Sequence, residues 1–203
     1  MLIKTDFLRP RGFVKITVTD KNTGEYYEYV RKQSLFDYVD ELLLNIPGSI
    51  LQNFGHNTAT YDARRVAAKL LAGMVYYKAN YIEWGDGGEN TPAATRSDNA
   101  LKGPYTPRLI TAINSKEFPT ADERAVKFKT KLSDEGPYAP NNTIIKEVGL
   151  YTHILSEIPS GSRVSYPNFP TNGYLIARHV IESGIDKTSA STEVGVEWMY
   201  IYN

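Results

Sequence analysis

The chain has 203 residues, no cysteine and zero formal net charge, because 23 basic residues balance 23 acidic ones. A chain of this length can bury a core without disulfides or structural metal. The lack of cysteine excludes thiolate catalysis and Cys-ligated zinc. Because the charges balance, the chain has no basic excess with which to hold a phosphate backbone. We therefore expect a globular protein that does not bind nucleic acid.

The N-terminal sequence and the hydropathy pattern bear on export and on membranes. The first residues, MLIKTDFLRPRGFV, contain no apolar region or small-residue cleavage site of a secretory signal. No apolar run approaches the roughly 18 residues needed to span a bilayer. We expect a protein made in the cytoplasm without membrane insertion.

Residues 1–80 predict an N-terminal arm (1–11), then a hairpin and helices (12–80). Apolar and polar residues alternate in FVKITVT, DKNTGE supplies a turn, and YYEYV returns. Ser34 can cap a helix that begins near Leu35 and stops at Pro47. A second helix is predicted over 62–76, where apolar residues recur at helical spacing.

The stretch 81–101, YIEWGDGGENTPAATRSDNAL, predicts a strand that ends in a glycine turn. Gly85 and Gly87 are expected to let the backbone take positive φ, but no Lys-Ser/Thr pair follows them, so the phosphate-loop signal is weak. Asp86 and Asp98 are expected to cap turns or a short helix with their carboxylates. We expect this stretch to carry the chain across a β-sandwich.

The remaining strands are predicted between 81 and 203. Lysines alternate with apolar residues in AVKFKTKL, which indicates a solvent face or a guarded edge. TIIKEVGLYT is a further strand, in which Gly149 is expected to mark a bulge. Residues 156–172 predict a long inserted loop without regular structure. GYLIARHVI and TEVGVEWMYIY are two strands separated by ESGIDKTSAS, and the end of the last strand is expected to be covered on both faces.

These elements predict the fold class. About eight strands and two helices indicate a mainly β protein with α decoration, an antiparallel β-sandwich plus one or two helices in the N-terminal half. We expect residues 1–203 to form a single domain.

The sequence contains no pattern that marks a catalytic or metal-binding site. The three histidines lie on separate elements, and no serine has the surroundings of a nucleophile. Two carboxylates among Glu83, Asp86, Glu89, Asp98 and Glu147 could form a glycosidase pair, but we rank this reading last. We predict no enzyme, catalytic residue, metal or cofactor. Glu147 and Arg178 carry opposite charges on two strands, and we expect them to pair, partly buried, and to set the strand register.

Seven short motifs occur in order along the chain and resemble those of a widespread group of tailed-bacteriophage virion structural proteins, described as tail, baseplate or tail-fibre-associated. They are Thr23-Gly24-Glu25, Trp84-Gly85-Asp86-Gly87, Thr91-Pro92-Ala93-Ala94-Thr95 with Asp98 and Leu101, Glu147-Val148-Gly149-Leu150-Tyr151, Ala177-Arg178, Asp186-Lys187-Thr188 and Val196-Glu197-Trp198. The chain departs from the group in the 156–172 loop, where a short turn is usual.

The resemblance implies a β-rich fold and a structural role in the virion. The expected function is that of a tail, neck or baseplate ring subunit, or a fibre-attachment adaptor, which assembles with other phage structural proteins and forms a symmetric homo-oligomer. The structural or assembly candidates are Trp84, Gly85, Asp86, Gly87, Glu147, Gly149, Arg178, Lys187 and Trp198. Tyr166, Pro167 and Phe169 form a candidate interaction loop.

Two alternatives remain at this point. The first is a receptor- or glycan-binding module in which tyrosines and Trp84 stack on sugar rings around the glycine turn. The second, ranked last, is a cell-wall glycan hydrolase that uses the carboxylates.

Overall fold

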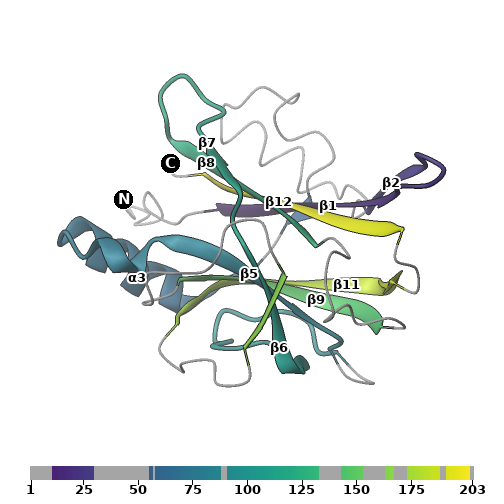
Figure 1. The fold of residues 1–203 in the computed structure, drawn as a ribbon. Helices are drawn as coiled ribbons and strands as arrows, with labels where there is room; N and C mark the ends of the chain where they lie inside the picture. The colour runs from purple at the N-terminus through teal and green to yellow at the C-terminus, as the bar shows by residue number, and fades with distance from the viewer. Residues whose placement is uncertain are drawn as a thin grey trace, which may run out of the picture.

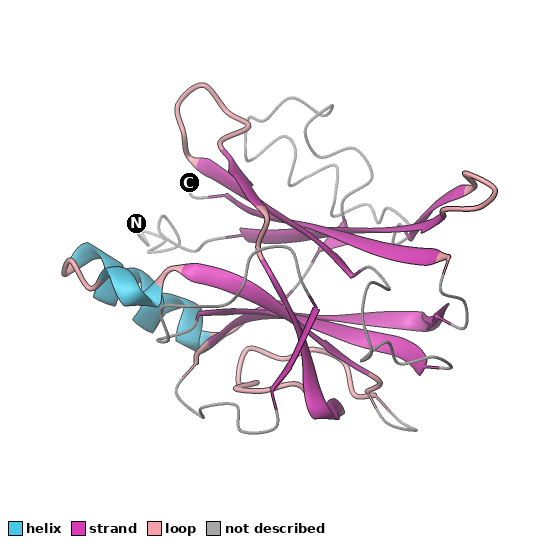
Figure 2. Cartoon of the chain, in the orientation of Figure 1, coloured by secondary structure: helices cyan, strands magenta, loops and turns pink. Residues whose placement is uncertain are grey.

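A computed structural model describes residues 11–29, 55–56, 58–87, 91–132, 143–152, 163–166, 173–187 and 191–201. Within these residues, two antiparallel sheets stack face to face, and one helix lies at one end of the stack (Figure 1). Strands make up most of the described chain (Figure 2). The predicted fold class, a mainly β sandwich with helical decoration, is confirmed.

The elements have the following bounds. The strands are β1 (Arg11–Asp20), β2 (Tyr26–Tyr29), β3 (Gly55–His56), β4 (Thr58–Ala59), β5 (Ala79–Gly85), β6 (Pro104–Ala112), β7 (Ser115–Glu117), β8 (Ala125–Leu132), β9 (Thr143–Thr152), β10 (Arg163–Tyr166), β11 (Leu175–Lys187) and β12 (Thr192–Ile201). The described helices are α3 (Tyr61–Leu71) and the short 3-10 turn η1 (Val75–Tyr77).

The first sheet has the order β2-β1-β12-β8-β7, and β3 pairs with β1. Its two central strands come from opposite ends of the described chain, since β1 pairs with β12 from Arg11 opposite Ile201 to Asp20 opposite Thr192. Closing this sheet therefore requires contacts between residues far apart in sequence, which is typical of sandwich folds.

The second sheet has the order β10-β6-β5-β9-β11-β4. β5 and β9 lie at its centre and pair along most of their length. The chain passes from this sheet to the first one between β6 and β7, at Ile113 and Asn114.

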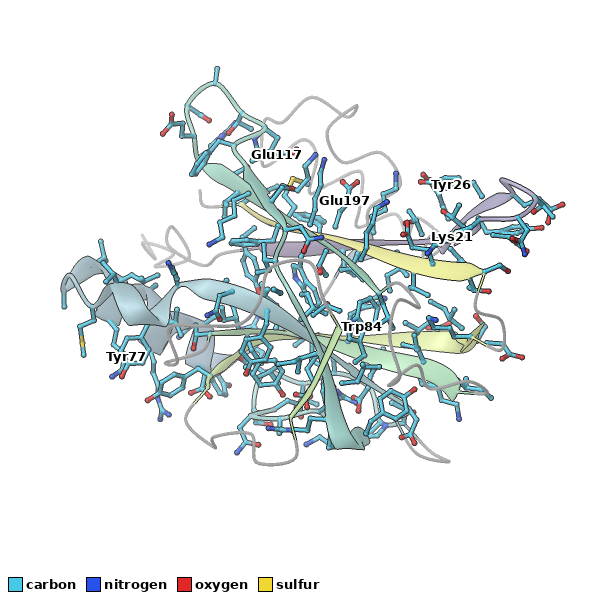
Figure 3. All side chains as sticks on the ribbon, viewed as in Figure 1. Lys21, Tyr26, Tyr77, Trp84, Glu117 and Glu197 are labelled. Carbon is cyan, nitrogen blue, oxygen red and sulfur yellow. The ribbon has the colours of Figure 1, made fainter. Side chains whose placement is uncertain are left out.

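The facing sides of the two sheets form the main hydrophobic core. Trp84 of β5 and Trp198 of β12 are both fully buried in it. Trp84 lies near the centre of the molecule (Figure 3), and its Nε1 donates a hydrogen bond to Thr111 Oγ1 at 3.0 Å. A buried indole N–H needs such a partner, because leaving it unpaired in the core is costly. Both candidate tryptophans thus serve the packing of the sandwich.

The N-terminal predictions are confirmed for the hairpin and need correction for the second helix. β1 and β2 pair, and the turn between them is closed by the Asn22 N–H, which donates to Asp20 Oδ1 at 2.8 Å. Helix α3 ends at Leu71 rather than at residue 76, because Gly73 adopts a φ of +79° that a right-handed helix cannot contain. The helix predicted from Leu35 and residues 1–10 of the arm lie outside the described residues.

The loop predicted over 156–172 contains a strand, so that prediction is wrong in part. Residues Arg163–Tyr166 form β10, which pairs with β6 from Arg163 opposite Thr111 to Tyr166 opposite Arg108. A four-residue strand is too short to show periodicity in sequence. Pro167 and Phe169 lie outside the described residues.

Two further details of the strand predictions are corrected. The residues ESGIDK, expected to separate two strands, continue β11, because the chain shifts register between Val180 and Ile185 with Gly184 at a φ of +65°. No register shift occurs at Gly149, which lies opposite Glu83 on one side and Arg178 on the other. The expectation of a bulge at Gly149 is therefore wrong.

The outer face of the first sheet carries paired charges. Lys127 and Lys129 of β8 both reach Glu117 of β7, at 2.9 and 2.6 Å. Glu117 and Glu197 lie on the face turned away from the second sheet (Figure 3). The lysines therefore line a solvent-side face, the first of the two predicted alternatives, because β7 covers the edge of β8. Such surface pairs contribute little to stability.

The end of β12 is covered on both faces, as predicted. Trp198 and Tyr200 belong to the core between the sheets, whereas the intervening Met199 and the final Ile201 are also fully buried. Alternate residues of a strand point to opposite faces, so both faces are shielded here.

Candidate functional site

The outer face of the second sheet is covered by residues 91–103, which lead into β6, and by Asp86 and Gly87, which follow β5; we call these described residues the covering segment. Ile82 and Trp84 point into the core, so Glu83 and Gly85 point outward. Because β5 and β6 are neighbours in one sheet, the segment returns to the sheet it left. The expectation that this stretch carries the chain across the sandwich is therefore wrong.

Gly149 leaves a gap on this outer face that the covering segment fills. A Cβ on Gly149 would lie 2.9 Å from Leu101 Cδ2 and 2.8 Å from Tyr151 Cε2, closer than such atoms pack. Leu101 is buried in a small outer cluster with Tyr81, Tyr151 and others. Its N–H donates to the Tyr151 hydroxyl at 3.1 Å. The glycine is required for close approach of the segment, not for a bulge.

The expectation of a positive φ at Gly85 is wrong, since only Gly87 of the two adopts one. Gly85 instead makes a second close approach possible. A Cβ there would lie 2.5 Å from the Gly103 carbonyl oxygen and 3.0 Å from Glu147 Cγ. Gly103 in turn donates its N–H to Glu147 Oε1 at 2.6 Å. The Asp86 N–H donates to the Gly103 carbonyl at 2.9 Å, so both ends of the segment meet beside Glu147.

Three buried side chains, Asp98, Glu147 and Arg178, form what we term the buried ionic cluster. Arg178 Nε lies 2.6 Å from Glu147 Oε2, and Arg178 Nη1 lies 3.0 Å from Asp98 Oδ2. Both Arg178 and Glu147 have side chains that are 0% exposed. The predicted Glu147–Arg178 pair is present, and it is fully rather than partly buried. Arg178 thus joins β9 to the covering segment.

Asp98 holds the covering segment in shape as well as in place. Its Oδ2 accepts the Thr95 N–H at 2.9 Å and its Oδ1 accepts the Thr95 hydroxyl at 2.9 Å, which is the turn-capping role predicted for it. Lys102 Nζ lies 3.1 Å from Asp98 Oδ1 and balances the second carboxylate of the cluster. Burial alone would raise the pKa of Asp98, but its hydrogen bonds from Thr95 and its pairs with Lys102 and Arg178 lower that pKa to about 2.

A second buried carboxylate, Glu83, lies on the same face. Arg108 Nε is 2.7 Å from Glu83 Oε1, and the Glu83 side chain is fully buried. Burial raises the pKa of Glu83, while the charge of Arg108 acts in the opposite direction. The Tyr151 ring stacks on Tyr81 at 5.2 Å between centroids. Charge and aromatic packing together fill the space beneath the covering segment.

The structure places the other predicted residues apart from this cluster or in supporting roles. Trp84 is fully buried in the core, so in this fold it cannot stack on a sugar ring as one alternative requires. Asp86 is exposed at the start of the segment, and Gly87 has a φ of +68° in the turn. Lys187 is buried at the end of β11 and lies opposite Thr143. The side chain of Tyr166 is not among those described.

Sequence reasoning missed Gly103, Lys102 and Arg108 as parts of this site. Gly103 precedes a proline in the run LKGPY, which is a turn signal that could have indicated the end of the covering segment. No local pattern distinguishes Lys102 or Arg108 from the other basic residues of the chain.

Chemistry at this site is restricted by burial. Glu83 and Glu147 are both fully buried and each lies against an arginine. Across the described ranges, no group of three or more His, Cys, Asp or Glu side chains is arranged to hold a metal ion. In the same ranges, no helix is long and apolar enough to cross a membrane. The arrangement is suited to holding a loop on a sheet.

Comparisons with protein-family models, with curated proteins and with solved structures give no match to this chain.

We predict that Glu147→Gln lowers the free energy of unfolding by about 3 kcal/mol, because it leaves Arg178 buried without its compensating charge. The measurement is urea denaturation at pH 7. Glu193→Gln is the matched control, since Glu193 pairs with Lys131, whose side chain is 64% exposed, and should cost less than about 1 kcal/mol. Equal and small effects of the two substitutions would contradict the assigned role of the cluster.

We also predict that Asp98 makes the free energy of unfolding depend on pH. The pKa of Asp98 is about 2 in the folded state and 3.8 without the fold's influence. Its contribution to the free energy of unfolding is therefore fully present above about pH 4 and is lost as the pH falls toward 2. A shift of this size corresponds to about 2 kcal/mol. The stability difference between the wild type and Asp98→Asn, measured by urea denaturation, should therefore shrink between pH 5 and pH 2.5. A difference that stays constant over this range would show that Asp98 titrates normally.

Proposed function

We propose that this chain is a structural component of a tailed-phage virion that works by protein–protein assembly. It would serve as a tail, neck or baseplate ring subunit or as a fibre-attachment adaptor. The motif order along the chain supports this role, and so does the balance of charge, which lets copies pack without long-range repulsion.

The observation that carries the proposal is a group of exposed apolar side chains at the C-terminal end of α3. Leu71 is 91% exposed and Val75 is 64% exposed, and Leu70 and Met74 beside them are about 40% exposed. We call these four residues the helix-end patch. Clustered exposed apolar side chains mark protein contact surfaces. In a ring subunit or adaptor, this patch would pack against a neighbouring copy.

The buried ionic cluster supports the same role indirectly. The candidate residues make contacts within the chain: Glu147 pairs with Arg178, and Gly149 lets Leu101 pack on the sheet. We infer that these contacts make the subunit rigid. A rigid subunit loses less conformational entropy when it assembles.

We predict that purified protein forms a defined oligomer and that Leu71→Glu with Val75→Glu disrupts it. A charge buried against a neighbour should raise the dissociation constant more than about thirtyfold, the factor that corresponds to about 2 kcal/mol. The measurement is analytical ultracentrifugation over a concentration series. Phe118→Glu is the control, because Phe118 is 60% exposed and follows β7 of the first sheet.

A protein that remains monomeric at all concentrations and is missing from the mass spectrum of purified virions would contradict the proposal. If the chain oligomerises but the helix-end substitutions act no more strongly than Phe118→Glu, the patch is not the contact surface.

A further inference from the structure

A cavity of about 230 Å³ lies beneath α3 at one end of the sandwich. Val66 of α3 forms one side of it, Leu150 and Ile176 of the second sheet form another, and Phe128 and Tyr200 of the first sheet form a third. The Tyr200 hydroxyl is turned to the Ile176 carbonyl, to which it donates at 3.3 Å. The walls are therefore apolar. An apolar cavity of about 150 Å³ is already large enough to admit benzene.

The charged residues that line this cavity have one sign. Twelve residues line it, and the two that carry charge are Lys78 and Lys116. Both residues are exposed to solvent. Neither has an ion-pair partner in the part of the chain that the structure describes. Burial, and after it the charge of Lys78, lower the pKa of Lys116.

The placement of Lys116 on β7 directs its side chain toward this cavity. Lys116 lies opposite Phe128 in the strand register, and Phe128 packs against the core. Its neighbour Glu117 points to the other face, where it pairs with Lys127 and Lys129. Glu117 thus compensates the charges of two lysines on the outer face, whereas Lys116 lies on the inner face, away from this carboxylate.

We propose that this cavity binds an organic anion with an unbranched apolar tail, of the medium-chain fatty acid class. The carboxylate lies at the side of the cavity that Lys78 and Lys116 line, where their positive charges compensate its own. The tail occupies the space between Leu150, Ile176 and Tyr200, where no polar group requires a partner. Apolar walls with a few charged groups at one end are the usual form of such ligand sites.

Isothermal titration calorimetry with three probes of equal tail length tests this proposal: decanoate, decanol and decyltrimethylammonium, each below its micellar concentration. We expect decanoate to bind with at least about tenfold higher affinity than either of the other two, because only its charge complements the lysines. Failure of decanoate to bind, or equal binding of the three probes, would overturn the proposal.

Substitutions of residues that line the cavity test whether decanoate binds there. Lys78→Gln with Lys116→Gln should weaken decanoate binding about tenfold, whereas Lys131→Gln, which removes an exposed lysine of β8, should leave it unchanged. Ala67→Phe, which fills the cavity from α3, should abolish binding of every probe. Equal effects of the lysine variants, or undiminished binding to Ala67→Phe, would show that decanoate binds elsewhere. Oligomerisation through the helix-end patch is measured by a separate experiment, so the assembly proposal and the ligand proposal can be contradicted independently.

Discussion

The contact between Arg178 and two carboxylates organises one whole face of this protein. Arg178 on β11 reaches Glu147 on β9 and Asp98 in the covering segment, and all three side chains are buried. A buried ion pair adds little net stability compared with apolar packing, but it tolerates few alternative arrangements. We infer that the cluster mainly selects one position of the covering segment on the sheet.

Two glycines make that position sterically possible. Gly85 and Gly149 clear the outer face of the second sheet, so that Gly103 and Leu101 can come close to the strands. The second sheet is then packed on both faces, by the first sheet on one side and by its own connecting segment on the other. Among the described residues, the helix-end patch remains exposed at the end of α3 and is available for contact with other molecules.

Regular alternation allowed much of the sandwich to be predicted from sequence, but contacts between distant residues did not follow from it. β1 and β12 show the alternation of half-buried strands, and the charges of Glu147 and Arg178 indicated their pairing. Leu101 and Tyr151 are 50 residues apart, so no local pattern links them. The strand β10 was missed because four residues show no period, and α3 was made too long because its apolar spacing continues past Gly73. Lys78 and Lys116, the two charged residues that line the cavity under α3, come from separate parts of the chain, which only the fold brings together.

The central claim is that Arg178 holds the covering segment on the sheet, and amide hydrogen exchange tests it most directly. The Leu101 and Gly103 amides donate to the Tyr151 hydroxyl and to Glu147, so both should be strongly protected in the wild type. In Arg178→Met, these two amides should lose protection while those of β1 and β12 keep theirs. Unchanged protection of Leu101 and Gly103 in that variant would contradict the account.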